Sequence, residues 1–227
     1  MLLALLLAGA VFLAQTALQQ ARELRGVRDS LEQRVAERTE ALAQANTALQ
    51  EVSGWQRSFL RDALANVTDG KQRLCSGASE LPPLRESPHS KSIALTPQGG
   101  LRDLRRRVIA AAEASHFLEE RVHDLVTAAN EAGMNAIVHA GAGIALICLD
   151  SSGTIQIWVE DAGQGISMEN LPRAALSRGF TTAGTLGHGL KMMLQAADRL
   201  WLLTGPTSTV VVLEQDRSVP EPAWSAL

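Results

Sequence analysis

The sequence has few cysteines and no excess of basic residues, and both shortages limit the possible functions. Cysteine occurs only twice in 227 residues, as Cys75 and Cys148, and residues so far apart in sequence form no metal-binding pair. We therefore expect two buried or idle thiols in a reducing compartment, without zinc or redox chemistry. The formal net charge is −3. This charge provides no basic patch of the kind that binds nucleic acid, so we expect no nucleic-acid partner.

Hydrophobic residues make up 46% of the chain, enough to bury one domain of ordinary size together with accessory segments. We expect this domain at residues 89–216, followed by a tail at 217–227. Candidate strands alternate with candidate helices, the strands at 92–95, 142–149, 154–161, 201–204 and 209–214, the helices at 101–114, 117–140 and 191–200. Glycine-containing turns at 150–153 and 205–208 indicate two hairpins. The pattern predicts a two-layer α/β sandwich, with a mixed or antiparallel sheet and helices on one face.

Three polar residues interrupt the apolar helical run at 130–140. Glu131, Asn135 and His139 recur every four residues, so they share one face of the helix. If that face is buried, an unpaired carboxylate or amide costs about 1–3 kcal/mol. The stripe therefore indicates a polar ligand, a metal ion or water against this face, unless the three residues belong to a satisfied core network.

Two later segments add to this pattern. Residues 159–166 form an apolar strand that ends in an acid, Asp161, followed by Gly163, Gly165 and Ile166. Residues 184–190 form a glycine loop that opens into a helix and contains Thr185, Gly187, His188, Gly189 and Leu190. In this order the three segments resemble the nucleotide-binding boxes of the GHKL ATPases, which include histidine kinases, gyrase-type ATPases and anti-sigma factor kinases. The resemblance spans residues 89–216 and implies the Bergerat-type ATPase fold.

ATP and Mg²⁺ are the cofactors that the resemblance implies. The Asp161 carboxylate suits the exocyclic amine of adenine, and a charge-assisted hydrogen bond of this kind contributes about 1.5–3 kcal/mol. Gly163 and Gly165 leave space where the backbone approaches the nucleotide, and Ile166 can pack beneath the base. The N–H groups of a helix start stabilise phosphates, so the second set of cofactor-binding residues is Thr185, Gly187, His188, Gly189 and Leu190.

Asn135 is the expected Mg²⁺ ligand, because this ion prefers oxygen and takes few protein groups beside phosphate. The resemblance makes Glu131 the catalytic acid that activates or orients the attacking nucleophile. Glu131 can instead serve only in hydration of the metal. His139, one turn further, contacts phosphate or only packs the helix.

The nucleotide lid between Gly165 and Gly187 is short. Gyrase-type ATPases and the related chaperones also need a transducer domain, for which the expected domains leave no residues, so both classes are disfavoured. The stretch 178–187 resembles the lid of the anti-sigma factor serine kinases. We therefore expect an ATP- and Mg²⁺-dependent protein kinase that phosphorylates a serine or threonine of a small protein similar to an anti-sigma factor antagonist.

Two alternatives belong to other classes. A sensor histidine kinase would act on a response regulator-like partner, but no histidine stands in the acid-x-Arg-x-x-Pro context that such kinases require, and the five are His89, His116, His123, His139 and His188. A non-catalytic module would bind a partner only when nucleotide is present. The presence of both Glu131 and Asn135 argues against such a module.

Residues 1–14 form an uninterrupted apolar run, which adjoining residues extend to about the 18–20 residues of a membrane span. We expect a membrane anchor at 1–20 rather than a secretory signal, because a basic n-region is missing. Arg22, Arg25 and Arg28 follow the run, and the positive-inside tendency would then place the rest of the chain in the cytoplasm. The expected location is therefore the bacterial inner (cell) membrane, crossed once, with a cytoplasmic catalytic domain.

Residues 21–54 show a heptad pattern that predicts a parallel coiled coil and a homodimer, with a solvated helix as the alternative. Arg38 and Ala45 weaken the seam. Residues 55–88 contain a candidate helix at 55–67, a possible short strand at 71–75 and a Pro-rich linker at 81–88, and their function is not assigned.

Overall fold

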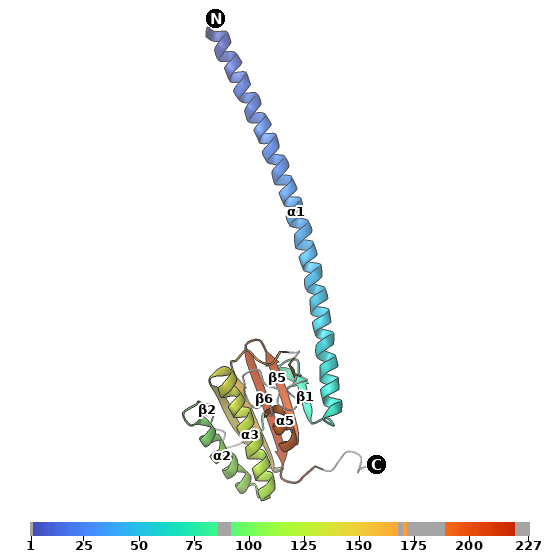
Figure 1. Ribbon diagram of the computed structural model, residues 1–227, viewed down its shortest axis with the longest axis vertical. Coiled ribbons are helices and arrows are strands. Elements are labelled where there is room, and N and C mark those ends of the chain that lie inside the picture. The colour runs from blue at the N-terminus through green and yellow to red at the C-terminus, as the bar shows by residue number, and fades with distance from the viewer. Residues whose placement is uncertain (1, 86–91, 168–169, 172–188, 221–227) are drawn as a thin grey trace. The chain divides into compact units, whose positions relative to one another are not determined.

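A computed structural model describes residues 2–85, 92–167, 170–171 and 189–220. The chain divides into two compact units, Met1–Trp55 and Gln56–Leu227. Helix α1 spans Leu2–Val67 (Figure 1). Its part up to Trp55 forms the first unit, and its last residues belong to the second unit. The separate helices expected at 21–54 and 55–67 are therefore parts of one helix. Gly54 does not break it.

The apolar residues of the heptads lie exposed on α1, with Leu31 at 51% and Leu42 at 71% of their possible surface. Within the residues whose side chains the structure describes, no helix is long and apolar enough to cross a membrane. The apolar run behind the expected anchor lies mostly outside those residues, because the side chains of 1–11 are not described. The anchor at 1–20 thus has no support from the structure and stays a prediction.

The second unit contains a six-stranded sheet in the order β1-β5-β6-β4-β3-β2. Its strands are β1 (Gln72–Cys75), β2 (Ile93–Leu95), β3 (Gly143–Leu149), β4 (Thr154–Asp161), β5 (Arg199–Gly205) and β6 (Ser208–Asp216). β1 is parallel to β5 and every other pair is antiparallel, so the sheet is mixed. The turns at 150–153 and 205–208 close the predicted β3–β4 and β5–β6 hairpins. The predicted mixed α/β fold is confirmed.

Helices α2 (Gly100–Ala114), α3 (Glu119–Ala140) and α5 (Gly189–Ala196) lie over one face of the sheet (Figure 1). The inward side of α3 is made of small residues, which lets its backbone pack closely, and these are Ala128, Ala129, Ala132, Gly133 and Ala136. A Cβ atom at Gly133 would lie 2.8 Å from a methyl group of Leu101 on α2. Gly141 ends α3 in the left-handed conformation, with φ of 78°. This close packing fixes the polar stripe of α3 relative to the sheet.

Two expected helix boundaries were wrong. The helix expected at 191–200 ends at Ala196, and Arg199 already belongs to β5, where it pairs with Glu214. The helix expected from Phe117 begins at Glu119, since Phe117 is buried in the core. Tertiary contacts override helical spacing at both positions.

The segment expected as a Pro-rich linker has no helix or strand between Leu81 and Arg85, where the description stops before 86–91, but it is hydrogen-bonded to the sheet. The backbone N–H of Arg85 donates to Gln156 Oε1 at 3.1 Å, and Gln156 Nε2 donates to the carbonyl of Pro83 at 3.2 Å. Leu81 packs against a small cluster around Trp201, on the sheet face away from the helices. The segment therefore covers part of that face.

Candidate functional site

The polar stripe of α3 lies at the edge of the core. Glu131 and Asn135 are half-buried and His139 is exposed, whereas the adjoining Ala132 and Ala136 are fully buried. Among the residues that the structure describes, the side chains of Glu131 and Asn135 have no hydrogen-bond partner. The described residues therefore do not form the alternative, a core network in which these polar side chains satisfy one another. An acid and an amide in this state are suited to a polar ligand.

The first residue of α5 lies directly against this stripe. A Cβ atom at Gly189 would lie 3.0 Å from Glu131 Oε2 and 3.3 Å from both polar side-chain atoms of Asn135. The absence of a side chain thus lets the start of α5 approach both residues. The N–H groups at a helix start attract anions, so an acid, an amide and anion-binding N–H groups meet at one point. Leu190, the next residue, points into the core.

Asp161 ends β4 and is half-buried. Its Oδ1 accepts a hydrogen bond from the N–H of Gly163 at 2.9 Å. Burial raises the pKa of Asp161, and the nearby Glu160 acts in the same direction, while the Gly163 hydrogen bond and the charge of His139 lower it. The end of α3 lies near the end of β4, since a Cβ atom at Gly163 would meet the carbonyl of His139. A carboxylate with few internal partners can still accept a hydrogen bond from a ligand.

The two glycines after Asp161 allow close backbone approaches. A Cβ atom at Gly163 would lie 3.0 Å from the Cβ of Ala140 and 3.2 Å from the carbonyl oxygen of His139. Gly165 has φ of +67°, and a Cβ atom there would lie 2.0 Å from the carbonyl oxygen of Gly205. No side chain can be accommodated at Gly165, so the turn is held against the end of β5.

Thr204 supports this turn and was not found from the sequence. Its hydroxyl oxygen accepts a hydrogen bond from the N–H of Ile166 at 2.7 Å, and the residue is only 2% exposed. Ile166 itself is half-buried and packs against the core. The only sequence signal was a polar residue at the end of an apolar strand, just before the 205–208 turn.

The remaining predicted residues of the loop, Thr185, Gly187 and His188, lie outside the described residues, as does the lid stretch 178–187. Within the described part of the chain, no group of three or more His, Cys, Asp or Glu residues is placed to hold a metal ion. Asn135, the expected ligand, would hold Mg²⁺ together with phosphate oxygens and water, which is how this ion is usually bound.

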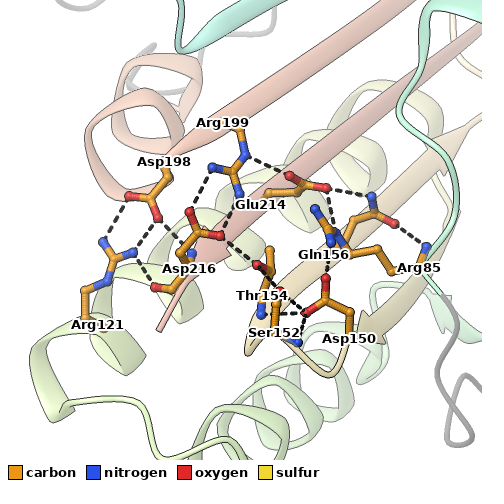
Figure 2. Close-up of polar contacts among 10 residues, drawn as sticks. All are labelled: Arg85, Arg121, Asp150, Ser152, Thr154, Gln156, Asp198, Arg199, Glu214 and Asp216. Atoms are coloured by element: carbon orange, nitrogen blue, oxygen red, sulfur yellow. Dashed lines mark hydrogen bonds and ion pairs between the residues drawn. The ribbon is translucent and has the colours of Figure 1, made fainter. Parts of the chain in front are cut away.

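The opposite end of the same strands carries a charged cluster, which we call the Arg–Asp cluster (Figure 2). It consists of Arg85, Arg121, Asp150, Asp198, Arg199, Glu214 and Asp216. Every acid in it contacts an arginine: Arg121 binds Asp198 at 2.5 Å, Arg199 binds Asp216 at 2.6 Å and Glu214 at 2.8 Å, and Arg85 binds Asp150. Its acids are thus paired with arginines within the described part of the protein, although the Nε of Arg121 is buried there without a hydrogen-bond partner.

The similarity to a known protein family lies within the second unit of the chain. The profile of a family described as the histidine kinase-like ATPase domain matches residues 93–214. No curated protein matches the chain. Among solved structures, the RsbU and RsbW domains of Rv1364c from Mycobacterium tuberculosis are similar, with 18% sequence identity and a TM-score of 0.43. The match covers 60% of this chain and 34% of that one, so this chain spans about a third of the other's length.

Proposed function

We propose a function on the basis of the family: the chain belongs to the histidine kinase-like ATPase family, whose profile covers more than half of it, at residues 93–214. Membership gives the chain a kinase-like, ATP-binding domain. Beyond that, we propose a Mg²⁺-dependent protein kinase of the anti-sigma factor type. Its substrate would be a serine or threonine of a small antagonist-like protein.

The observation that supports phosphoryl transfer best is the meeting of Glu131, Asn135 and the start of α5. A Cβ atom at Gly189 would nearly touch both side chains, at 3.0 and 3.3 Å. Phosphate groups at the helix start would therefore lie within reach of an amide that can hold Mg²⁺ and of a carboxylate that can accept a proton. A carboxylate at this point can accept the proton of a substrate hydroxyl, which favours transfer over nucleotide binding alone.

Each of these residues then has a definite task. Asp161 accepts a hydrogen bond from the adenine amine, while Thr204 and Gly165 hold the turn beside it. Glu131 takes the proton from the substrate hydroxyl. The hydroxyl oxygen bonds to the γ-phosphorus of ATP while the bond between the γ-phosphorus and the ADP oxygen breaks. Bound Mg²⁺ supplies neutralisation of the phosphate charge, and Asn135 provides an oxygen for it.

The reaction product tests this proposal. The full-length protein is incubated with radiolabelled ATP, Mg²⁺ and candidate antagonist domains, with Glu131→Gln as the control. We expect acid-stable phosphoserine or phosphothreonine on the added domain, and little of it with the control. Acid-labile phosphohistidine on the chain itself would identify a sensor histidine kinase, and nucleotide binding without any transfer would identify a binding module.

The long helix α1 motivates a second part of the proposal, that two copies pair through it as a parallel coiled coil. Its apolar heptad residues are exposed in the single chain, including Leu24 at 70%, Leu42 at 71% and Leu49 at 69%. Pairing would remove these side chains from water. Analytical ultracentrifugation should show a dimer, and removal of residues 1–52 should leave a monomer that still binds ATP.

We also propose, from the apolar sequence at 1–20, that the chain is anchored in a bacterial cell membrane with its kinase domain in the cytoplasm. Carbonate extraction of membranes from expressing cells tests this. The full-length protein should stay with the membrane, and a variant without residues 1–22 should be released.

A further inference from the structure

One side chain of α1, Arg57, connects this helix to the sheet beside the candidate nucleotide site. Its Nη2 donates hydrogen bonds to the carbonyl oxygens of Thr204, at 3.0 Å, and Cys75, at 3.3 Å. The last residue pair of the β1–β5 ladder is Cys75 with Leu203. The carbonyl of Thr204 therefore lies one residue beyond the end of β1, and the guanidinium of Arg57 provides the donor that a longer strand would have supplied.

Thr204 is also the residue that supports the turn after Asp161. Its hydroxyl accepts the N–H of Ile166 at 2.7 Å, and a Cβ atom at Gly165 would lie 2.7 Å from the same hydroxyl oxygen. Two hydrogen bonds in series thus lead from α1 to this turn, the first at the carbonyl and the second at the hydroxyl of Thr204. A shift of that carbonyl would move the hydroxyl that holds Ile166.

The position of Arg57 is set by the last turns of α1. Leu60 and Leu64 follow it at helical spacing on the same face, and both pack against the core, with Leu64 only 2% exposed. The Nε of Arg57 is buried and has no hydrogen-bond partner among the described residues. The two carbonyls are therefore what hold the guanidinium in place.

We propose that Arg57 is a positioning residue for nucleotide binding, which makes ATP affinity depend on how the end of α1 is seated against β5. The inference rests on the proposed function, because it takes the Asp161 side of the domain as the nucleotide site. The fold thus contains a route from the helix to the site.

The test compares Arg57→Ala with Arg57→Lys and with the control Arg61→Ala in the full-length protein. Arg61 lies one turn further along α1, contacts only Ser58 and Asp62 of the same helix in the described structure, and is likewise partly exposed. Arg57→Ala should weaken ATP binding by roughly three- to tenfold, the loss of about one hydrogen bond. Arg57→Lys should recover part of the affinity, because an ammonium can still donate to Thr204. Arg61→Ala should bind as the wild type does.

Hydrogen–deuterium exchange in the absence of nucleotide gives a second, independent measurement. In Arg57→Ala the amide of Ile166 should exchange faster than in the wild type, while in Arg61→Ala it should not. In a Thr204→Val background the hydroxyl link is already absent, so adding Arg57→Ala should change affinity no further.

Wild-type affinity and wild-type Ile166 exchange in a folded Arg57→Ala protein would overturn the inference, as would an equal loss in Arg61→Ala. If the wild type itself binds no ATP, the proposed function is wrong. The exchange of Ile166 would then still decide whether Arg57 holds the turn.

Discussion

The acidic side chains at the two ends of strand β4 differ in how many partners the protein provides for them. At the Thr154 end, the Arg–Asp cluster surrounds each acid with arginine or other donors (Figure 2). At the Asp161 end, seven residues and roughly 23 Å away at the usual strand rise, Asp161 accepts one hydrogen bond, from Gly163. Glu131 and Asn135 near that end have none among the described residues.

The difference separates a structural site from a binding site. Burial raises the pKa of Glu214, yet hydrogen bonds from Arg85, Arg199 and Gln156 outweigh it and hold this pKa below its ordinary value. At Asp161 burial wins, and the pKa is raised. Acids that the protein itself pairs stabilise the fold, whereas acids left with few partners retain capacity for a ligand.

The largest expected effect concerns chemistry at the open end. Glu131→Gln keeps the shape of the side chain but cannot accept a proton, so phosphoryl transfer should fall about 10²–10⁴-fold. ATP affinity should change little, because the amide still reaches the start of α5. Single-turnover transfer and calorimetric titration measure the two quantities separately. An unchanged transfer rate would make Glu131 structural and erase the contrast between the two ends.

The next prediction concerns stability at the paired end. Arg121→Ala would leave Asp198 buried without its arginine, since both side chains are less than a tenth exposed, and should lower the free energy of unfolding by about 3–5 kcal/mol. Urea titration measures this loss. Arg106→Ala is the control, because Arg106 is 78% exposed and its pair with Asp103 should contribute less than about 1 kcal/mol. Equal effects would show that the cluster is not a structural core.

A smaller effect is expected when the acceptor for adenine is removed. Asp161→Asn loses a charge and presents a donor to a donor, so ATP affinity should fall by about one to two powers of ten. Glu160→Gln is the matched control, since it removes one negative charge from the neighbouring exposed residue. Similar losses in both variants would indicate a general charge effect in place of a specific contact.

The smallest predicted effect is a dependence of binding on pH. In the proposed function, adenine binding uses the ionised Asp161, whose pKa is raised by burial, so affinity should be full above that pKa and should decrease as the pH falls through it. The decrease should begin at higher pH than an ordinary aspartate, with a pKa of about 3.9, would give. ATP itself titrates in the same way with the wild type and with Asp161→Asn. The difference between the pH profiles of their ATP affinities therefore isolates the contribution of the Asp161 carboxyl group. Parallel profiles would contradict the assignment.

The sequence was sufficient for those parts of the molecule that local pattern determines. Alternating apolar residues and glycine turns predicted strands β3, β4 and β6, and four-residue spacing predicted the face of α3 that carries Glu131. Long-range pairing was beyond its reach. Arg199 reads as part of a helix until its partner Glu214 is known, and Arg85 reads as part of a linker until Gln156 and Glu214 are seen beside it.

The same limit applies to the candidate site. Gly165 was recognisable as the second glycine of the turn after Asp161, where the backbone is expected to approach a neighbour closely, but that neighbour, Gly205, is distant in sequence. Arg57 carries no local signal, and for Thr204 the signal was only a polar residue at the end of an apolar strand. Their roles depend on carbonyl and amide groups that only the folded sheet brings near them.

Calorimetric titration of the full-length protein with ATP, with and without Mg²⁺, tests most directly whether Asn135 and Asp161 bind ATP with Mg²⁺. We expect saturable binding at one site per chain that weakens without Mg²⁺, and loss of this difference in Asn135→Ala. Absence of binding, or binding by Asn135→Ala that responds to Mg²⁺ as the wild type does, would contradict it.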